Sequence, residues 1–413
     1  ENGDFMGFDI VIGNPPYGVS IKDQYRKAVV GILGNVPDYE IYYYFIQIAE
    51  MLLVEKGIMS YIIPNTYLFN NFAKNYRLSI LDRWNVLEIL DCTKFKIFES
   101  ATVFNTINTW QKNTFGSPEF IGYRRTSNIT SFAELLDNPR TFLRKEDLLK
   151  MNQNWGLAFF LSDKVVTLIN KLSGNTNSIS NYYDCSQGYI PYRLSDLISV
   201  YGKEEGTRIK TQRLWHSKQK TSEYYIQEIY GRDISKYDYS VSGEFIKYGK
   251  HVACYVNPIF FTSPRLLVRE ITNPTIIACF ITDSYINDPQ LLPIIAKDGS
   301  LESLYYLWGI LNSKLATFYH FNHSPKATKG AFPKILVQDI KDFPLPVVSN
   351  DVKSIITELV KQVLKNHSKG LDTKTDEQQI DLIVYHLYGL TYDEVLIVDP
   401  ETPITREEYE QSK

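Results

Sequence analysis

Apolar and polar positions alternate along the first 110 residues in a way that favours two kinds of element. Short apolar runs predict buried strands, and stretches with a period near 3.6 residues predict helices. Because the two alternate, this part is expected to form half of a doubly wound α/β sheet. The predicted strands are 8–13, 58–63, 86–91 and 103–110, and the predicted helices are 39–54 and 72–83.

The pattern loosens after Lys112. One more strand at 120–125 and a connector with short helices at 126–157 precede a helix at 163–172. Beyond it, short apolar runs separated by turn glycines predict an α+β region, in which 304–321 forms one helix.

From residue 352 the chain is predicted to be helical and acidic to about residue 388. The expected fold is therefore α/β followed by α+β, with a helical tail. The corresponding domains are 1–155, 156–346 and 347–413.

The net charge of −3 conceals an uneven distribution. Residues 1–110 hold 9 basic and 12 acidic side chains, residues 111–350 hold 28 and 22, and residues 351–413 hold 7 and 13. A mildly basic middle section between acidic flanks is suited to a polyanionic partner. The aromatic content of 14% serves packing first, and it also supplies rings for a surface on which bases stack.

The four cysteines are far apart in sequence and form no CxxC pair, and the six histidines make no ligand-spaced cluster with them. We therefore expect a reducing, cytoplasmic compartment, no disulfide framework and no metal site. No apolar run reaches the length of a membrane span and no signal peptide opens the chain, so no membrane partner is expected.

The segment FDIVIGNPPYG, residues 8–18, carries the clearest chemical signal. A strand delivers Asn14 at its carboxyl end, where open α/β sheets bind their ligands. Pro15 and Pro16 stiffen the turn that follows. The Asn14 side-chain oxygen and the Pro15 carbonyl then offer two acceptors to one exocyclic amine, and Tyr17 offers a ring on which a planar base can stack. The plainer interpretation is a proline-stiffened turn capped by an asparagine.

This arrangement suits methylation of an adenine amine. The lone pair of that nitrogen is delocalised into the ring, and two accepted hydrogen bonds favour a pyramidal nitrogen that attacks a sulfonium methyl. Positioning and hydrogen bonding suffice, and the base must first be flipped out of a duplex. A protein glutamine and an RNA adenine present the same amine, so these targets stay open, as does a DNA-recognition module that is inactive on its own.

These residues resemble motif IV of the gamma-class DNA adenine-N6 methyltransferases, the group that includes the TaqI methyltransferase. The resemblance continues over most of the chain, and its last segment is similar to the tail of combined type II restriction-modification enzymes. The segments are DYEIYYYFIQIAEMLLVEKG, IMSYIIPNTYL, KFKIFESATVF, YGRDISKY (230–237), LLVREI (266–271), LNSKL (311–315), KGAFPKILVQDIKDFPLP (329–346) and HLYGLTYDE (386–394).

The resemblance implies the C-terminal half of a Rossmann-like methyltransferase sheet, then a TaqI-like target-recognition domain. It implies methyl transfer from S-adenosylmethionine to a flipped adenine in double-stranded DNA, within a restriction-modification system. Asn14 to Tyr17 would be catalytic, and Phe98 falls where the family packs an aromatic against the flipped base. Phe45 would reach the adenine of the cofactor, with packing in the core as an equal alternative.

The chain departs from the family pattern on the cofactor side. The glycine-rich cofactor loop and the acidic ribose-binding residue should precede motif IV, and neither occurs before residue 14. We therefore expect the main S-adenosylmethionine motif in a missing N-terminal half of the enzyme. Without that half, the strand at 8–13 would be an exposed apolar edge. No PD…(D/E)xK nuclease set is found either.

Two basic segments are candidates for DNA contact. Residues 207–221 hold five basic side chains and no acidic one, with an aromatic among them, which is typical of a loop that follows phosphates. An ordinary solvated loop is the alternative. Arg232 of the GRDI element is predicted to be structural, paired with Asp233 or Asp238. The candidates are Arg208, Lys210, Arg213, Trp215, Lys218 and Lys220, and, in 323–334, Lys326 and Lys329.

Overall fold

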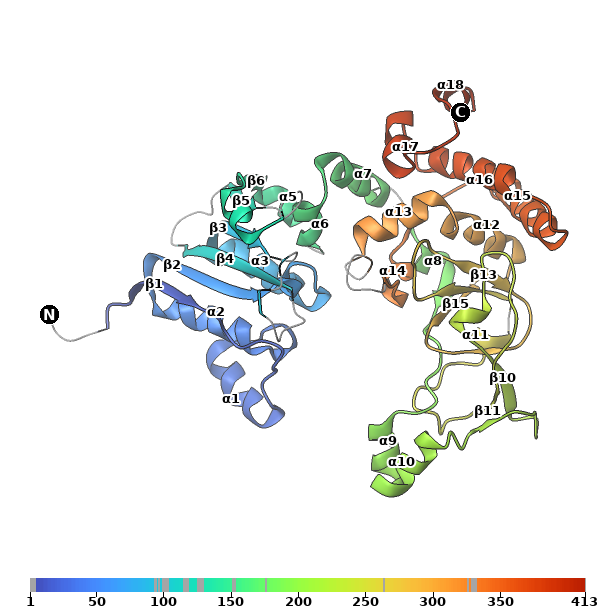
Figure 1. The fold of residues 1–413 in the computed structure, drawn as a ribbon, viewed down its shortest axis with the longest axis horizontal. Coiled ribbons are helices and arrows are strands. Elements are labelled where there is room, and N and C mark those ends of the chain that lie inside the picture. The colour runs from blue at the N-terminus through green and yellow to red at the C-terminus, as the bar shows by residue number, and fades with distance from the viewer. Residues whose placement is uncertain are drawn as a thin grey trace. The chain divides into compact units, whose positions relative to one another are not determined.

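A computed structural model describes residues 5–92, 95, 97–98, 104–113, 119–124, 130–150, 154–174, 177–262, 264–324, 327 and 333–412. The chain divides into two compact units, Glu1–Val166 and Thr167–Lys413 (Figure 1). The helical tail belongs to the second unit in this division. Within the described residues, every helix is too short or too polar to traverse a bilayer.

The first unit is built on a six-stranded sheet of order β1-β2-β4-β3-β5-β6. β1 pairs with β2 in parallel, whereas β4 runs antiparallel to both β2 and β3. The carboxyl ends of β1, β2 and β3 therefore lie at one edge of the sheet. The strands are β1 (Phe8–Gly13), β2 (Leu53–Pro64), β3 (Trp84–Asp91), β4 (Asn105–Lys112), β5 (Phe120–Arg124) and β6 (Thr141–Arg144).

Helices and one face of this sheet enclose the core of the first unit. Met59 and Tyr61 of β2 and Trp110 of β4 are buried there with the tyrosines of α2. The helical elements are α1 (Asp23–Leu33), η1 (Pro37–Tyr39), α2 (Ile41–Leu52), η2 (Asn65–Leu68), η3 (Asn71–Ala73), α3 (Lys74–Arg83), α4 (Phe132–Asp137), α5 (Lys145–Lys150) and α6 (Trp155–Phe160), and α7 (Asp163–Gly174) continues into the second unit.

The predicted α/β class of this part is confirmed, but three details of the prediction are wrong. β1 is not buried: Phe8, Ile10 and Ile12 are 50%, 63% and 80% exposed, because β1 is an edge strand. The helix α1 was not predicted, although Val29 and Leu33 on one side of it pack against the core. α2 ends at Leu52, before Gly57, because Leu53 is already extended and pairs with Phe8 in the sheet.

The second unit contains three small sheets. Their strand orders are β14-β10-β11-β9, β13-β12-β15-β8 and β16-β7. The strands are β7 (Asn177–Ser178), β8 (Tyr183–Cys185), β9 (His216–Ser217), β10 (Tyr225–Ile229), β11 (Phe245–Lys247), β12 (Arg265–Arg269), β13 (Ala278–Ile281), β14 (Ile286–Asn287), β15 (Leu291–Ala296) and β16 (Pro344–Leu345).

Helices join these sheets and form the tail, so the predicted α+β class is confirmed. The predicted single helix at 304–321 is wrong, since Ser313 accepts a hydrogen bond from Ala316 N (3.1 Å) and begins a new helix. The helices are α8 (Ile179–Tyr182), α9 (Leu194–Tyr201), α10 (Lys203–Thr211), η4 (Gly231–Asp233), α11 (Ile259–Thr262), α12 (Leu301–Leu311), α13 (Lys314–His323), α14 (Val337–Lys341), α15 (Asn350–Ser368), α16 (Lys374–Leu387), α17 (Tyr392–Val398) and α18 (Arg406–Gln411).

A buried cation links β12 to a neighbouring turn. The Arg265 side chain is fully buried and donates to the carbonyl oxygens of Asp283 (2.9 Å) and Tyr285 (2.8 Å). Burial lowers the pKa of Arg265 to about 10. Carbonyl partners for a buried guanidinium hold the two backbone segments together.

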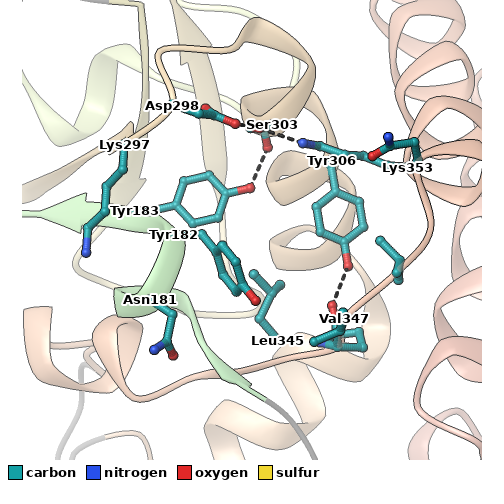
Figure 2. A pocket seen from close by; sticks show the side chains of 13 residues that line it. Asn181, Tyr182, Tyr183, Lys297, Asp298, Ser303, Tyr306, Leu345, Val347 and Lys353 are labelled. Atoms are coloured by element: carbon teal, nitrogen blue, oxygen red, sulfur yellow. Dashed lines mark hydrogen bonds between the residues drawn. The ribbon is translucent and has the colours of Figure 1, made fainter.

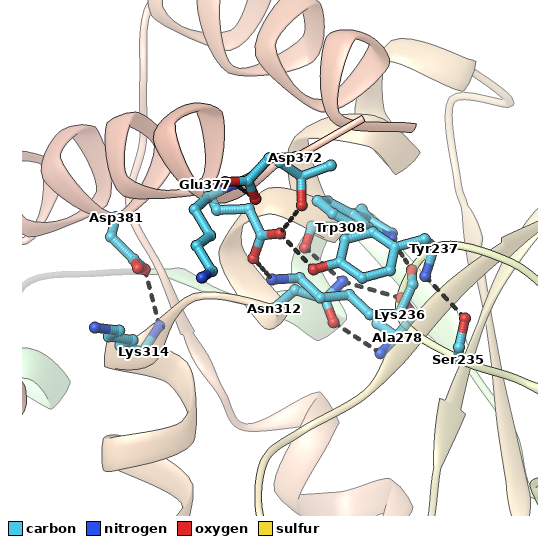
Figure 3. A network of polar contacts seen from close by, with 12 residues as sticks. Ser235, Lys236, Tyr237, Ala278, Trp308, Asn312, Lys314, Asp372, Glu377 and Asp381 are labelled. Atoms are coloured by element: carbon cyan, nitrogen blue, oxygen red, sulfur yellow. Dashed lines mark hydrogen bonds and ion pairs between the residues drawn. The ribbon is translucent and has the colours of Figure 1, made fainter. Parts of the chain in front are cut away.

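Polar contacts join the tail to the rest of the second unit, and Figure 3 shows those of Glu377 and Asp381. Glu377 of α16 pairs with Lys236 and accepts a hydrogen bond from Tyr237. Lys314 Nζ lies 2.6 Å from Asp399 Oδ2, and the Lys314 N–H donates to Asp381 Oδ1 at 2.9 Å. Burial raises the pKa of Asp381 to about 6.

Figure 2 shows a cavity of about 260 Å³ in the second unit, between β8, α12 and the start of α15. Lys353 donates to Ser303 Oγ (2.7 Å), which donates to Asp298 (2.7 Å), and Lys297 donates to the Ser180 carbonyl (2.7 Å). Both lysines that line the cavity thus donate hydrogen bonds to other residues of the protein. The cavity lies where the tail packs against the sheet.

Candidate active site

Motif IV lies at the carboxyl edge of the first sheet. Asn14 directly follows β1 and is exposed, Pro15 is buried, and Tyr17 is half-buried against the core. Gly18 has a φ of 71°, a left-handed conformation that suits glycine, so the chain can turn away after Tyr17. The structure therefore presents the amide and the ring at the edge where the sequence predicts them.

Hydrogen bonds fix the segment after the motif to the turn before α2. Ser20 pairs with Glu40 in an antiparallel bridge, and Ser20 Oγ donates to the Asp38 carbonyl at 3.0 Å. Val19 accepts from the N–H of Ile41 at 3.0 Å. Residues 14–20 are thus held at both ends, by β1 and by these bonds, which limits the positions open to Tyr17.

The segment after β2 is anchored from within. The fully buried Arg77 of α3 donates through Nη1 to the carbonyls of Tyr67 (2.8 Å) and Asn70 (2.9 Å). Tyr67 in turn donates to Asn108 of β4 at 2.5 Å. Burial lowers the pKa of Arg77 to about 10. Residues 65–73, which follow β2, are therefore anchored to α3 and β4 by buried hydrogen bonds.

Phe98 lies on the segment between β3 and β4 and is half-buried. β3 ends at Asp91, opposite Thr106 of β4, at the same sheet edge as Asn14. β1 and β3 are three strand spacings apart, roughly 14 Å. The segment that carries Phe98 starts from this edge, and the contact of Phe98 with a flipped base stays a prediction.

Phe45 of α2 is 37% exposed, so it is not a core residue. With Ile48 and Met51 it forms an apolar stripe on the outer side of α2. This exposure leaves the ring accessible, and its contact with the adenine of a cofactor stays a prediction. One apolar contact cannot hold a charged sulfonium cofactor by itself, so the fit is partial.

The segment 207–221 is not one loop. Its first part is the end of α10, where Arg208 pairs with Glu205 at 2.7 Å. Arg213 pairs with Glu244 at 3.1 Å, and Trp215 stacks on Tyr192 with ring centroids 4.8 Å apart. Arg213 and Trp215 therefore serve the internal structure of this region.

Three lysines of this segment, by contrast, point to solvent. Lys210, Lys218 and Lys220 are exposed, and no ion pair is seen for them within the described part of the chain. They remain the candidates for phosphate contact. The other predicted pair, Lys326 and Lys329, lies outside the described residues.

The GRDI element is supported by a buried carboxylate. Arg232 is exposed, with its Nε 3.8 Å from Asp233, which agrees with the predicted pair. Glu228 of β10 is buried and lies 3.0 Å from His216 Nε2. Although burial opposes its charge, hydrogen bonds from His216 and Tyr189 lower the pKa of Glu228.

Sequence analysis missed the anchoring role of Arg77. Its position was a usable signal: it stands three and four residues before Ile80 and Leu81, within the apolar stripe of the predicted helix 72–83. A lone arginine on the inward face of a helix indicates a buried cation, which requires acceptors.

Comparisons with families of known proteins give one match in each of the two compact units. Residues 1–98 match the model of the Eco57I restriction-modification methylase family, and residues 226–345 match the TaqI-like C-terminal specificity domain. The predicted resemblance to restriction-modification methyltransferases with a TaqI-like domain is thereby confirmed. The specificity match begins just before the GRDI element and ends at β16.

Two proteins of Methanocaldococcus jannaschii are similar in sequence. One, named as a type II restriction enzyme and methyltransferase, RM.MjaORFECS2P, is 24% identical over 92% of this chain and 31% of its own length. The type II methyltransferase M.MjaIV is 31% identical over 24% of this chain and 34% of its own length. This chain thus spans about a third of the length of each.

Solved structures show the same fold at low sequence identity. The type IIL restriction-modification enzyme MmeI in complex with DNA has a TM-score of 0.55 and 12% identity, over 97% of this chain and 57% of that one. The ATP-dependent type ISP enzyme LlaBIII bound to DNA has a TM-score of 0.52 and 11% identity, over 87% and 29%.

Proposed function

We propose that this chain, which joins a restriction-modification methylase segment to a TaqI-like specificity domain, takes part in methylating the N6 amine of adenine in double-stranded DNA. The observation that carries the proposal is the position of Asn14, Pro15, Pro16 and Tyr17 at the carboxyl edge of a parallel strand pair. That edge is where open α/β sheets bind ligands.

The residues act by position rather than by proton transfer. The Asn14 side-chain oxygen and the Pro15 carbonyl accept the two amine hydrogens and orient the nitrogen lone pair. Tyr17 stacks on the extruded base, with Phe98 on the edge as a second aromatic contact. The bound cofactor, S-adenosylmethionine, supplies the methyl group. Correct orientation is itself a large contribution to the rate.

The open edge of β1 supports a second part of the proposal, the completion of the sheet. Ile10 and Ile12 are exposed beside Ile58 and Ser60 of β2, and among the described residues no strand pairs with the other side of β1. An apolar edge and face of this kind favour pairing with another strand and its helix. We propose that residues outside this sequence occupy this position and hold most of the cofactor.

The identity of the methylated product tests the proposed function. The complete enzyme is incubated with mixed-sequence duplex and S-adenosylmethionine, and the DNA is digested to nucleosides for mass spectrometry. We expect N6-methyldeoxyadenosine. A methylated cytosine, a product on RNA alone, or a methylated protein glutamine would each overturn the proposal.

Tyr17→Ala and Phe98→Ala should each weaken extrusion of the target adenine by about 1–3 kcal/mol, because a stacking contact is lost. The fluorescence of 2-aminopurine at the target position measures this. The control is Phe142→Ala, since Phe142 lies on the other edge strand, β6, and is 61% exposed. Equal fluorescence in the Tyr17 variant and wild type would show that Tyr17 does not stack on the extruded base.

Replacing Lys210, Lys218 and Lys220 together by glutamine should weaken duplex binding and flatten its salt dependence. Each lost phosphate contact makes the negative slope of log K against log salt shallower by about 0.9. Lys365, Lys369 and Lys374 of the tail segment are the matched control, because they are also exposed and no ion pair is seen for them among the described residues. A slope equal to that of the control variant would show that the first three lysines are only solvated.

A further inference from the structure

One exposed aromatic side chain stands beside motif IV without a role in the function described so far. Phe72 of η3 is 74% exposed, the largest value for a phenylalanine among the described residues. An exposed phenylalanine on a soluble surface is unremarkable by itself. The structure of the segment that carries it makes this one different.

The backbone around Phe72 is fixed by a costly set of contacts. Its N–H donates to Asn70 Oδ1 at 3.2 Å, and the N–H of Ala73 donates to the Asn70 carbonyl at 3.0 Å. The same carbonyl accepts from the buried Arg77 at 2.9 Å. Burying a cation costs free energy that only well-placed acceptors offset, and two of the acceptors of Arg77 are the carbonyls of this segment. The arrangement resembles a rigid support for a functional side chain.

Connections within the first unit place Phe72 on the motif IV side. Residues 65–73 follow β2, whose carboxyl end is beside that of β1. η3 lies against η1, and the residues around η1 are bonded to the segment after Tyr17: Ile21 N–H donates to the Tyr39 carbonyl at 3.0 Å. Three turns therefore meet at this edge, and Phe72 is on one of them.

We propose that Phe72 is a wedge that inserts into duplex DNA at the base step opened by extrusion of the target adenine. An extruded base leaves neighbouring base pairs unstacked, and an apolar side chain between them compensates for lost stacking. Phenylalanine has the flat, uncharged shape required, and its rigid turn avoids an ordering cost on binding. This inference rests on the proposed methylation of a flipped base.

The test is single-turnover methylation by the complete enzyme with Phe72→Ala and Phe72→Trp. On a fully paired duplex, Phe72→Ala should lose about tenfold in rate, within the roughly 5- to 150-fold range for one lost stacking contact. On a duplex with an abasic site opposite the target adenine, extrusion is easier and most of the loss should disappear. Phe72→Trp should stay within about threefold of wild type on both.

Phe142→Ala is the control for removing an exposed phenylalanine from the first unit. A rate for Phe72→Ala equal to that of this control on the paired duplex would overturn the wedge. An equal loss on both duplexes would also overturn it, since the residue would then act elsewhere than in extrusion. Wild type that yields no N6-methyldeoxyadenosine would instead refute the proposed function.

Discussion

Asn14→Ala in the complete enzyme should lower the single-turnover rate of methyl transfer by about 10²–10³-fold, while the affinity for duplex DNA stays near that of wild type. The magnitude is that of removing one acceptor or donor aimed at charge that develops in a transition state. Asn14 is exposed at the end of β1 and supports no core contact, so the loss should not come from unfolding.

The rate is followed with labelled S-adenosylmethionine, and affinity by fluorescence anisotropy of a labelled duplex. Asn14→Asp is the matched variant, because its carboxylate keeps an acceptor in the same place, and it should lose less than Asn14→Ala. If Asn14→Ala retains a rate within about tenfold of wild type, Asn14 does not bind the reacting amine.

Arg265→Met should destabilise the second unit by about 3–5 kcal/mol. Methionine fills a similar space but lacks the guanidinium. The buried carbonyls of Asp283 and Tyr285 therefore lose the hydrogen bonds that they accept from Arg265. Each buried polar group without a partner costs about 1–3 kcal/mol. Such a loss is a large part of the usual stability of a domain.

Urea unfolding of the whole chain, followed by circular dichroism, measures this change, and hydrogen exchange of the β12 and β15 amides reports on the second unit alone. Arg208→Met is the control, because Arg208 is exposed and only pairs with Glu205 on the same helix. It should change the free energy of unfolding by less than about 0.5 kcal/mol. A similar small effect for Arg265→Met would mean that the turn at 283–285 does not depend on this residue.

The parts of the fold that were predicted correctly are those with a strong periodic signal. The strand before Asn14 and the helix α2 could be read from their apolar spacing. α1 was missed because its inward stripe is short and only partly buried, with Val29 and Leu33 against the core near the end of the helix. The break between α12 and α13 was missed although Ser313 caps the new helix locally, and Asn312 beside it bonds Ala278 across the fold, a contact that local spacing does not contain.

The candidate site shows the same limit. Asn14 to Tyr17 could be identified because their chemistry is contained in four consecutive residues. The basic segment 207–221 misled in part, since charge alone does not reveal that Arg213 pairs with Glu244. Sequence distance hides such partners, whereas the support that Arg77 gives to the turn carrying Phe72 comes from a residue only seven positions from Asn70.

The contacts of Glu377 with Lys236 and Tyr237 have a consequence for how recognition changes in evolution. A recombination that exchanged only the specificity domain would replace the segment after the GRDI element, which holds Lys236 and Tyr237. The α16 helix of the original protein would then face a segment without these partners for Glu377. Crossovers near Val166 and Thr167 keep both partners of this seam in one inherited block. New specificities should therefore arise by exchange of the domain together with its C-terminal helices, and chimaeras built in the laboratory should follow the same boundary.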